Sequence, residues 1–85
     1  MAKGDSMIDA GIEDGDLVLI HQQTTADDGQ IVVALVDNET TLKRLFHDST
    51  GKKIVLVPEN KYYKNQTYEN VEVQGVATMV IKKLK

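Results

Sequence analysis

A hairpin signal in the middle of the chain constrains the fold more than any other feature of the sequence. Every residue from Ile31 to Val36 is apolar, and most of them are β-branched. Asp37-Asn38 then suits a tight turn, and residues 39–46 can return as an antiparallel partner. A continuous apolar run of this kind fits a strand with both faces covered. We therefore expect the 31–36 strand to be buried on both faces, inside a sheet.

Three further apolar segments predict strands on either side of this hairpin. They cover residues 17–22, 54–57 and 71–81. Pro58 ends the second segment, because proline cannot donate to a strand ladder. Gly75 lies inside the third segment, where glycine indicates a β-bulge or the close approach of another backbone. The sequence therefore predicts a mainly β fold.

The remaining segments predict short local structure. Residues 6–12 suit a short helical turn that ends near Gly11, and such a turn needs tertiary support. Residues 60–66 are polar and predict an irregular crossing between strands. The 85 residues contain no repeat, linker or low-complexity stretch. We expect one small domain over residues 1–85.

Charge and composition exclude several classes of function. The formal net charge of −3 makes the chain a poor candidate to bind nucleic acid by itself. The sequence has no cysteine, and His21 and His47 are isolated, so we expect neither a metal site nor a cofactor. No apolar run is long enough to span a bilayer, and no signal peptide opens the chain. We expect a cytoplasmic protein without a membrane partner.

Ser6 and Lys43 are the residues that can carry chemistry. A serine hydroxyl is a weak nucleophile unless a neighbouring base takes its proton, and a lysine kept neutral by burial can be that base. Strand alternation places Lys43 on the same face as Thr41 and Leu45, which is a partly apolar environment. Two plainer interpretations stay open on chemistry alone. Ser6 also fits a helix N-cap, and Lys43-Arg44 also fits a pair of solvated charges.

A series of motifs along almost the whole chain resembles one known family, and the order and spacing of the motifs are more specific than any one of them. The motifs are Gly4-Asp5-Ser6-Met7, Gly11-Ile12 with Asp14-Gly15-Asp16, Gly29 followed by Ile31-Val32-Val33-Ala34, Thr41-Leu42-Lys43-Arg44-Leu45, Leu56 with Pro58-Glu59-Asn60, and Val73 with Gly75-Val76 and Val80-Ile81. Together they resemble the C-terminal domain of the LexA repressor and its S24-type relatives. Those relatives are self-cleaving phage repressors and UmuD-type polymerase accessory proteins.

The resemblance implies a LexA/signal-peptidase-like fold of coiled antiparallel strands and a serine endopeptidase that cleaves its own chain. It implies that Ser6 is the nucleophile and that Lys43 is the general base. The backbone N–H groups of Asp5 and Ser6 are the implied oxyanion donors. The implied function is that of the catalytic and dimerisation domain of a transcriptional repressor in the DNA-damage (SOS) response.

The resemblance also implies partners, and it leaves alternatives open. A recombinase filament on single-stranded DNA would act as co-inducer, and DNA would be bound only through a helix-turn-helix domain absent from this chain. One alternative is a non-cleaving dimerisation or regulatory domain of a phage-type repressor or a UmuD-type polymerase subunit. Another is a β-rich adaptor in which Ser6 is only an N-cap. A helix-turn-helix encoded upstream would favour the repressor, and a short arm would favour the polymerase subunit.

The chain also departs from the family pattern. LexA-like proteins carry their scissile bond, a small residue followed by glycine, upstream of the serine. Ala10-Gly11 is the only Ala-Gly pair in this chain, and it follows Ser6, so we do not interpret it as that bond. A strand usually precedes the serine, and only five residues do so here, which leads us to expect a fold truncated at the N-terminus. Met79 stands where relatives often have glycine.

The last predicted strand indicates self-association. Simple alternation over residues 71–82 leaves apolar residues on both faces, with Val73 and Met79 on one and Val76 and Val80 on the other. A long apolar strand near a chain end favours pairing with a second chain, and LexA-like domains form two-fold dimers through their C-terminal regions. We expect a homodimer with residues of this strand at an isologous interface.

Overall fold

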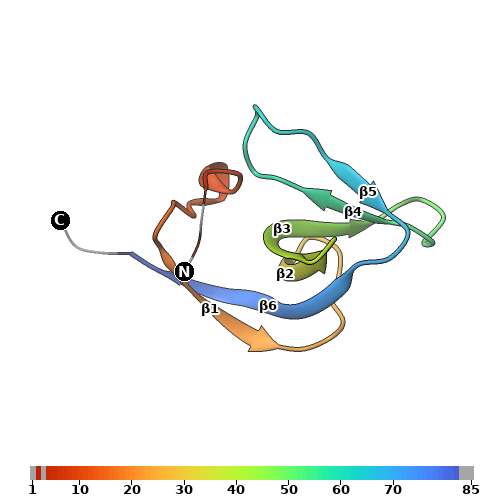
Figure 1. The fold of residues 1–85 in the computed structure, drawn as a ribbon, viewed down its shortest axis with the longest axis horizontal. Coiled ribbons are helices and arrows are strands. Elements are labelled where there is room, and N and C mark those ends of the chain that lie inside the picture. The colour runs from red at the N-terminus through yellow and green to blue at the C-terminus, as the bar shows by residue number, and fades with distance from the viewer. Residues whose placement is uncertain (1, 3, 83–85) are drawn as a thin grey trace.

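The computed structural model describes residue 2 and residues 4–82, and it shows one coiled antiparallel sheet (Figure 1). The sheet has six strands in the spatial order β1-β6-β2-β3-β4-β5. The elements are the 3₁₀ turn η1 (Ile8–Ala10) and the strands β1 (Leu17–Gln22), β2 (Ile31–Val36), β3 (Glu39–His47), β4 (Ile54–Val57), β5 (Gln66–Tyr68) and β6 (Glu72–Ile81). The prediction of a mainly β fold of coiled antiparallel strands is confirmed.

The β2–β3 hairpin forms as predicted. Asp37 and Asn38 have φ values of 49° and 67°, so both residues of the turn adopt the left-handed conformation of the tightest hairpins. This turn sets Lys43 opposite Val32 in the register. The expectation that β2 is buried on both faces is wrong for one of them. Val32 and Ala34 are fully buried, whereas the alternate residues of the strand are half-buried.

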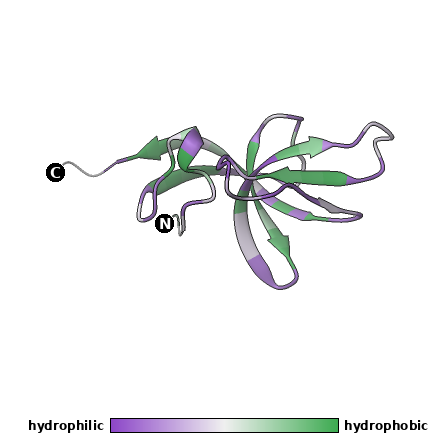
Figure 2. Cartoon of the chain, turned by 90° about the horizontal axis from the view of Figure 1, so that it is seen from above, coloured by the Kyte–Doolittle hydropathy of each residue, from purple (hydrophilic) through white to green (hydrophobic). Residues whose placement is uncertain are grey.

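The core lies inside the curl of the sheet. The β1–β6 pair passes below the β2–β3 hairpin in Figure 1, and the β4–β5 pair lies above it. Figure 2 shows that hydrophobic residues concentrate in the strands and hydrophilic residues in the turns. The buried cluster draws on four of the strands and contains Val32, Ala34, Leu45, Leu56, Val73 and Val76. These residues come from β2, β3, β4 and β6. Strand β3, which carries Lys43, is therefore packed against the core through Leu45.

Two irregularities in β6 break the alternation that the sequence predicts. The register of β6 against β2 shifts between Val73 and Gly75, and Val73 and Val76 are both buried as a result. Placing these two valines on opposite faces was therefore wrong. Gly75 allows a close approach, as predicted, because an added Cβ would lie 2.2 Å from Ile20 Cγ2 and 2.9 Å from the carbonyl oxygen of His21.

The order of the strands places β6 inside the sheet, between β1 and β2, so within the described residues the sheet edges are β1 and β5. Strand β5 pairs with β4 and begins at the end of the segment for which we predicted an irregular crossing. The predicted helical turn is a single 3₁₀ turn closed by Gly11, whose φ is 82°. In the part of the chain that the structure describes, no helix is long and apolar enough to cross a membrane.

Candidate active site

The structure brings Ser6 and Lys43 together, although they lie far apart in the sequence. Lys43 Nζ lies 3.0 Å from Ser6 Oγ and 2.6 Å from Thr41 Oγ1. Thr41 and Lys43 share one face of β3, as alternation predicts, and the hydroxyl of Thr41 holds the lysine amine beside the serine. The separation of amine and hydroxyl is within the reach needed for direct proton transfer.

The environment of Lys43 favours its neutral form. The side chain lies between β3 and the N-terminal loop and is half-buried. Burial lowers the pKa of the Lys43 amine below its usual value, because partial removal from water disfavours the charged ammonium form. A neutral amine carries the lone pair that can accept the proton of a serine hydroxyl. The site therefore places a hydroxyl and a partly desolvated amine within hydrogen-bond distance of each other.

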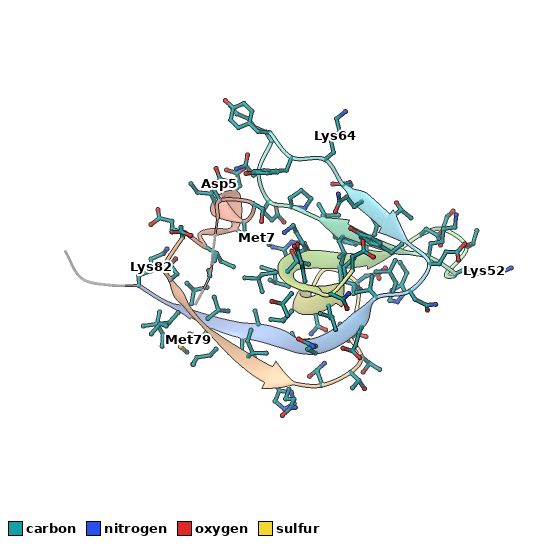
Figure 3. The ribbon with its side chains drawn as sticks, in the orientation of Figure 1. Asp5, Met7, Lys52, Lys64, Met79 and Lys82 are labelled. Carbon is teal, nitrogen blue, oxygen red and sulfur yellow. The ribbon has the colours of Figure 1, made fainter. Side chains whose placement is uncertain are left out.

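Ser6 lies on a loop that short-range and long-range contacts hold in place. Gly4 has a φ of 79°, and its N–H donates to Asp14 Oδ1 at 2.6 Å. Met7 and Ile12 are both 3 % exposed and anchor the loop on its inner side. Figure 3 shows Asp5 and Met7 on this N-terminal turn, next to the hairpin that carries Lys43. The serine is therefore fixed by the packing of its neighbours rather than by a regular element.

The two backbone groups that we expect to stabilise an oxyanion are available. Among the described residues, neither the Asp5 N–H nor the Ser6 N–H donates a hydrogen bond. Ser6 is half-buried and Asp5 is exposed. The N–H of Ser6 belongs to the same residue as the hydroxyl, so it lies close to any group that the hydroxyl contacts.

A segment after β4 contacts the serine loop, and we did not include it among the site residues from the sequence. Asn60 Nδ2 donates to the carbonyl oxygen of Asp5 at 2.8 Å, and the Asp9 N–H donates to the carbonyl oxygen of Glu59 at 2.7 Å. The Tyr63 hydroxyl donates to the carboxylate of Asp5, and this bond raises the pKa of Tyr63. The one signal in the sequence was the Pro58-Glu59-Asn60 motif, which we used only for the family resemblance.

A cleft of about 390 Å³ opens at the Ser6–Lys43 pair. Its walls are mostly small or apolar side chains from the N-terminal loop, β1, β2 and the first half of β3. They are Ala2, Gly4, Ser6, Met7, Ile12, Val18, Ile20, Val33, Thr40, Thr41, Leu42 and Lys43. An open apolar cleft with a few converging polar groups is typical of a ligand or substrate site. The described residues contain no group of histidines and carboxylates that could hold a metal ion.

Fold and cleft together define a class: a small, mainly antiparallel β domain with a serine and a lysine in contact at an open cleft. The family model described as Peptidase S24-like matches residues 1–78, which is most of the chain. The chain belongs to the Peptidase S24-like family.

Individual relatives are named LexA repressor. A LexA repressor of Cereibacter sphaeroides (strain ATCC 17029) is 57 % identical over 76 residues, covering 86 % of this chain and 33 % of the relative. A LexA repressor of Clostridium botulinum (strain Langeland) is 54 % identical over 72 residues, which cover 85 % of this chain and 35 % of the relative. A LexA repressor of Desulfitobacterium hafniense (strain DCB-2) is 49 % identical over 73 residues, which cover 86 % of this chain and 35 % of the relative. The chain therefore spans about a third of the length of the repressors it matches.

Proposed function

We propose that this chain is the catalytic and dimerisation domain of a LexA-like repressor, and that it cleaves a peptide bond with a Ser6–Lys43 dyad. The observation that carries the proposal is the 3.0 Å contact between Lys43 Nζ and Ser6 Oγ at an open cleft. The lowered pKa of Lys43 supports it, because the same contact between a charged lysine and a serine would not activate the hydroxyl.

The chemistry follows from the positions of these groups. Neutral Lys43 removes the proton from Ser6 Oγ as the oxygen attacks the scissile carbonyl carbon. The N–H groups of Asp5 and Ser6 stabilise the negative charge that develops on the carbonyl oxygen. The Lys43 ammonium then gives its proton to the leaving amine, and an ester to Ser6 remains. In the second half, Lys43 deprotonates a water molecule that hydrolyses this ester and frees the hydroxyl.

The surroundings of the dyad suit an extended peptide as substrate. Strand β3 pairs with β4 only from Arg44 onward. Among the described residues, the first half of β3 therefore has a partner strand on the β2 side alone. An extended chain can add its backbone to such an open strand, with alternate side chains entering a cleft. In a self-cleaving repressor, this substrate would be a segment upstream of Ser6.

The partners follow from the same proposal. DNA binding belongs to a helix-turn-helix domain elsewhere in the repressor, and a recombinase filament on single-stranded DNA promotes the cut in the DNA-damage response.

A second copy of the chain would cover the apolar pairs Leu17–Ile81 and Leu19–Met79, whose four side chains are about half exposed on the β1–β6 end of the sheet. Sedimentation equilibrium should show a dimer for the unmodified chain and a monomer for Met79→Asp, and a monomeric unmodified chain would contradict this assembly.

The test of the proposed activity is cleavage in trans. The chain is incubated with an extended peptide that carries an Ala-Gly bond, and the products are identified by mass spectrometry. Ser6→Ala should abolish cleavage, whereas Ser49→Ala, which changes an exposed loop serine, should leave it unchanged. A folded chain that does not cleave any such peptide at high concentration, or Ser6→Ala cleaving as fast as the unmodified chain, would contradict the peptidase and favour a non-cleaving regulatory domain.

A further inference from the structure

We propose that Asn60 is a positioning residue whose side-chain amide sets the orientation of the Asp5–Ser6 peptide group, so that the Ser6 N–H is held ready for the oxyanion. The inference rests on the proposed peptidase function and adds a residue to it from a different part of the chain. Asn60 lies beyond β4, on the loop that touches the serine segment, and the residue is 9 % exposed.

The polarity of the Asn60 amide is fixed by its two partners. Its oxygen Oδ1 accepts the N–H of Tyr62 at 3.0 Å, and its nitrogen Nδ2 donates to the carbonyl oxygen of Asp5 at 2.8 Å. Both partners are backbone groups, so each can play only one part in a hydrogen bond. Rotating the amide by 180° would place oxygen against oxygen and N–H against N–H. The donor therefore has to face the Asp5 carbonyl.

A held carbonyl also determines the direction of the next N–H. The peptide group is planar and almost always trans, so the Asp5 C=O and the Ser6 N–H point in opposite directions. When Asn60 holds the carbonyl on its own side, the Ser6 N–H points away from Asn60. This N–H has no hydrogen-bond partner among the described residues. The other donor to the Asp5 carbonyl is the N–H of Ile8 at a longer distance of 3.2 Å, so Asn60 makes the closer contact.

The segment that carries Asn60 is itself anchored to the strand that carries the base. Arg44 Nε pairs with Glu59 Oε1 at 2.5 Å, and Arg44 follows Lys43 directly on β3. Glu59 thus contacts the neighbour of the lysine, and Asn60 contacts the peptide group of the serine. Two consecutive residues tie both halves of the dyad to one short segment. Such an arrangement limits how far the Ser6 N–H can drift from the position in which Lys43 activates the hydroxyl.

Asn60→Asp tests the inference, because it keeps the acceptor for Tyr62 and replaces the donor to Asp5 with a carboxylate oxygen that cannot donate when ionised. In the trans-cleavage assay, kcat should fall about tenfold to a hundredfold, which is somewhat less than the loss of an oxyanion donor itself. KM should be unchanged. As the pH falls and the introduced carboxyl group gains a proton, it can donate again, so the ratio of variant to unmodified rate should recover. Tyr63→Phe is the matched control, since it removes a bond from the same loop to the Asp5 side chain, and its kcat should be unchanged.

A second measurement does not depend on activity. The ¹⁵N–¹H signal of the Ser6 amide should be sharp in the unmodified chain and in Tyr63→Phe, and it should shift and broaden in Asn60→Asp and in Asn60→Ala. An unmoved Ser6 signal in a folded Asn60 variant, or an equal fall of kcat in Tyr63→Phe, would overturn the inference and leave the proposed peptidase intact. Absence of cleavage by the unmodified chain would refute the peptidase, whereas the amide signal would still decide whether Asn60 orients this peptide group.

Discussion

The two members of the Ser6–Lys43 pair are held by very different structures. Lys43 lies in a nine-residue strand whose next residue on the same face, Leu45, is 1 % exposed in the core. Ser6 lies in a loop without regular structure, and that loop is held by the buried side chains of Met7 and Ile12 and by single hydrogen bonds to Asp14 and Asn60. Lys43 therefore derives its position from the sheet as a whole, and Ser6 from a small set of local contacts, some of which can be removed one at a time.

This difference separates stability from activity. Changes around Lys43 act on the core and should affect the unfolding of the whole domain. Changes around Ser6 act on a loop whose local opening leaves the sheet intact, so they should lower activity more than stability. Loops that carry reactive groups on a rigid scaffold are common among enzymes. The predictions below test how completely the two halves can be separated.

The largest expected effect is that of Lys43→Met on the proposed cleavage. The variant keeps a flexible apolar stem and removes the base, so the rate should fall at least about a thousandfold, which is roughly 4 kcal/mol of transition-state stabilisation. The free energy of unfolding should rise, because a half-buried polar amine that burial desolvates is replaced by an apolar side chain. Kinetics and urea unfolding of the same sample measure both. Lys53→Met, in an exposed loop, is the control, and a Lys43→Met chain that cleaves normally would contradict the role of the base.

Leu45→Ala should have the next largest effect, and it should act on the fold. The side chain is fully buried in the core cluster, so its truncation should cost about 2–5 kcal/mol of the free energy of unfolding. For a domain of this size, each kcal/mol lowers Tm by about 4–8 °C. Thermal unfolding followed by circular dichroism gives the value. A fall in Tm of less than about 4 °C would mean that β3 does not depend on this core.

The next largest effect should be the dependence of the cleavage rate and of stability on pH, which reports the protonation of Lys43. In the proposed mechanism the neutral form of Lys43 is the active one, so the rate should rise up to about tenfold per pH unit until the pH passes the lowered pKa. Stability should rise over the window between this lowered pKa and the ordinary lysine pKa, because there the unfolded chain binds more protons than the folded one. Lys43→Met should lose this increase in stability. A rate that falls as pH rises through neutrality would argue against a lysine base.

Asp14→Ala should have the smallest effect on the fold. It removes the acceptor for the Gly4 N–H at an exposed position, so the free energy of unfolding should fall by only about 0.5–1.5 kcal/mol. The cleavage rate should fall more than this loss of stability alone would produce, because the loop before Ser6 loses an anchor. Asp27→Ala, which changes an exposed residue of another turn, is the control. Equal rates for the two variants would show that the loop does not need this bond.

Local rules predicted the strand half of the site better than the loop half. The apolar run, the Asp37-Asn38 turn and simple alternation were enough to predict the hairpin and the shared face of Thr41 and Lys43. The contact of Ser6 with Lys43 was expected from a family resemblance, because no local rule joins residues so distant in the chain. That resemblance is confirmed by the S24-like match, and the catalytic roles stay predictions.

What the sequence missed depends on contacts between distant segments. Gly75 indicated the irregularity of β6 that lies between Val73 and Gly75, but alternation could not anticipate the second one, between Ala77 and Met79, where β6 pairs with β1. The contact of Asn60 with Asp5 joins residues 55 positions apart, and an asparagine after a proline looks like any other turn residue. Strand β5 has only three residues, which is too short for a periodic signal.

The hairpin turn at Asp37-Asn38 has a consequence for the order in which the molecule assembles. A two-residue hairpin closes within microseconds from neighbouring segments, so Lys43 can reach its register early. Ser6 is synthesised first, yet its loop is complete only when Asn60 arrives, which takes several seconds at ribosomal rates of about 5–20 residues per second. We expect the nascent chain to carry an inert serine until the last contacts close. If the proposed self-cleavage is correct, a Ser6–Lys43 pair that forms only late in folding would protect an unfinished chain from cutting itself.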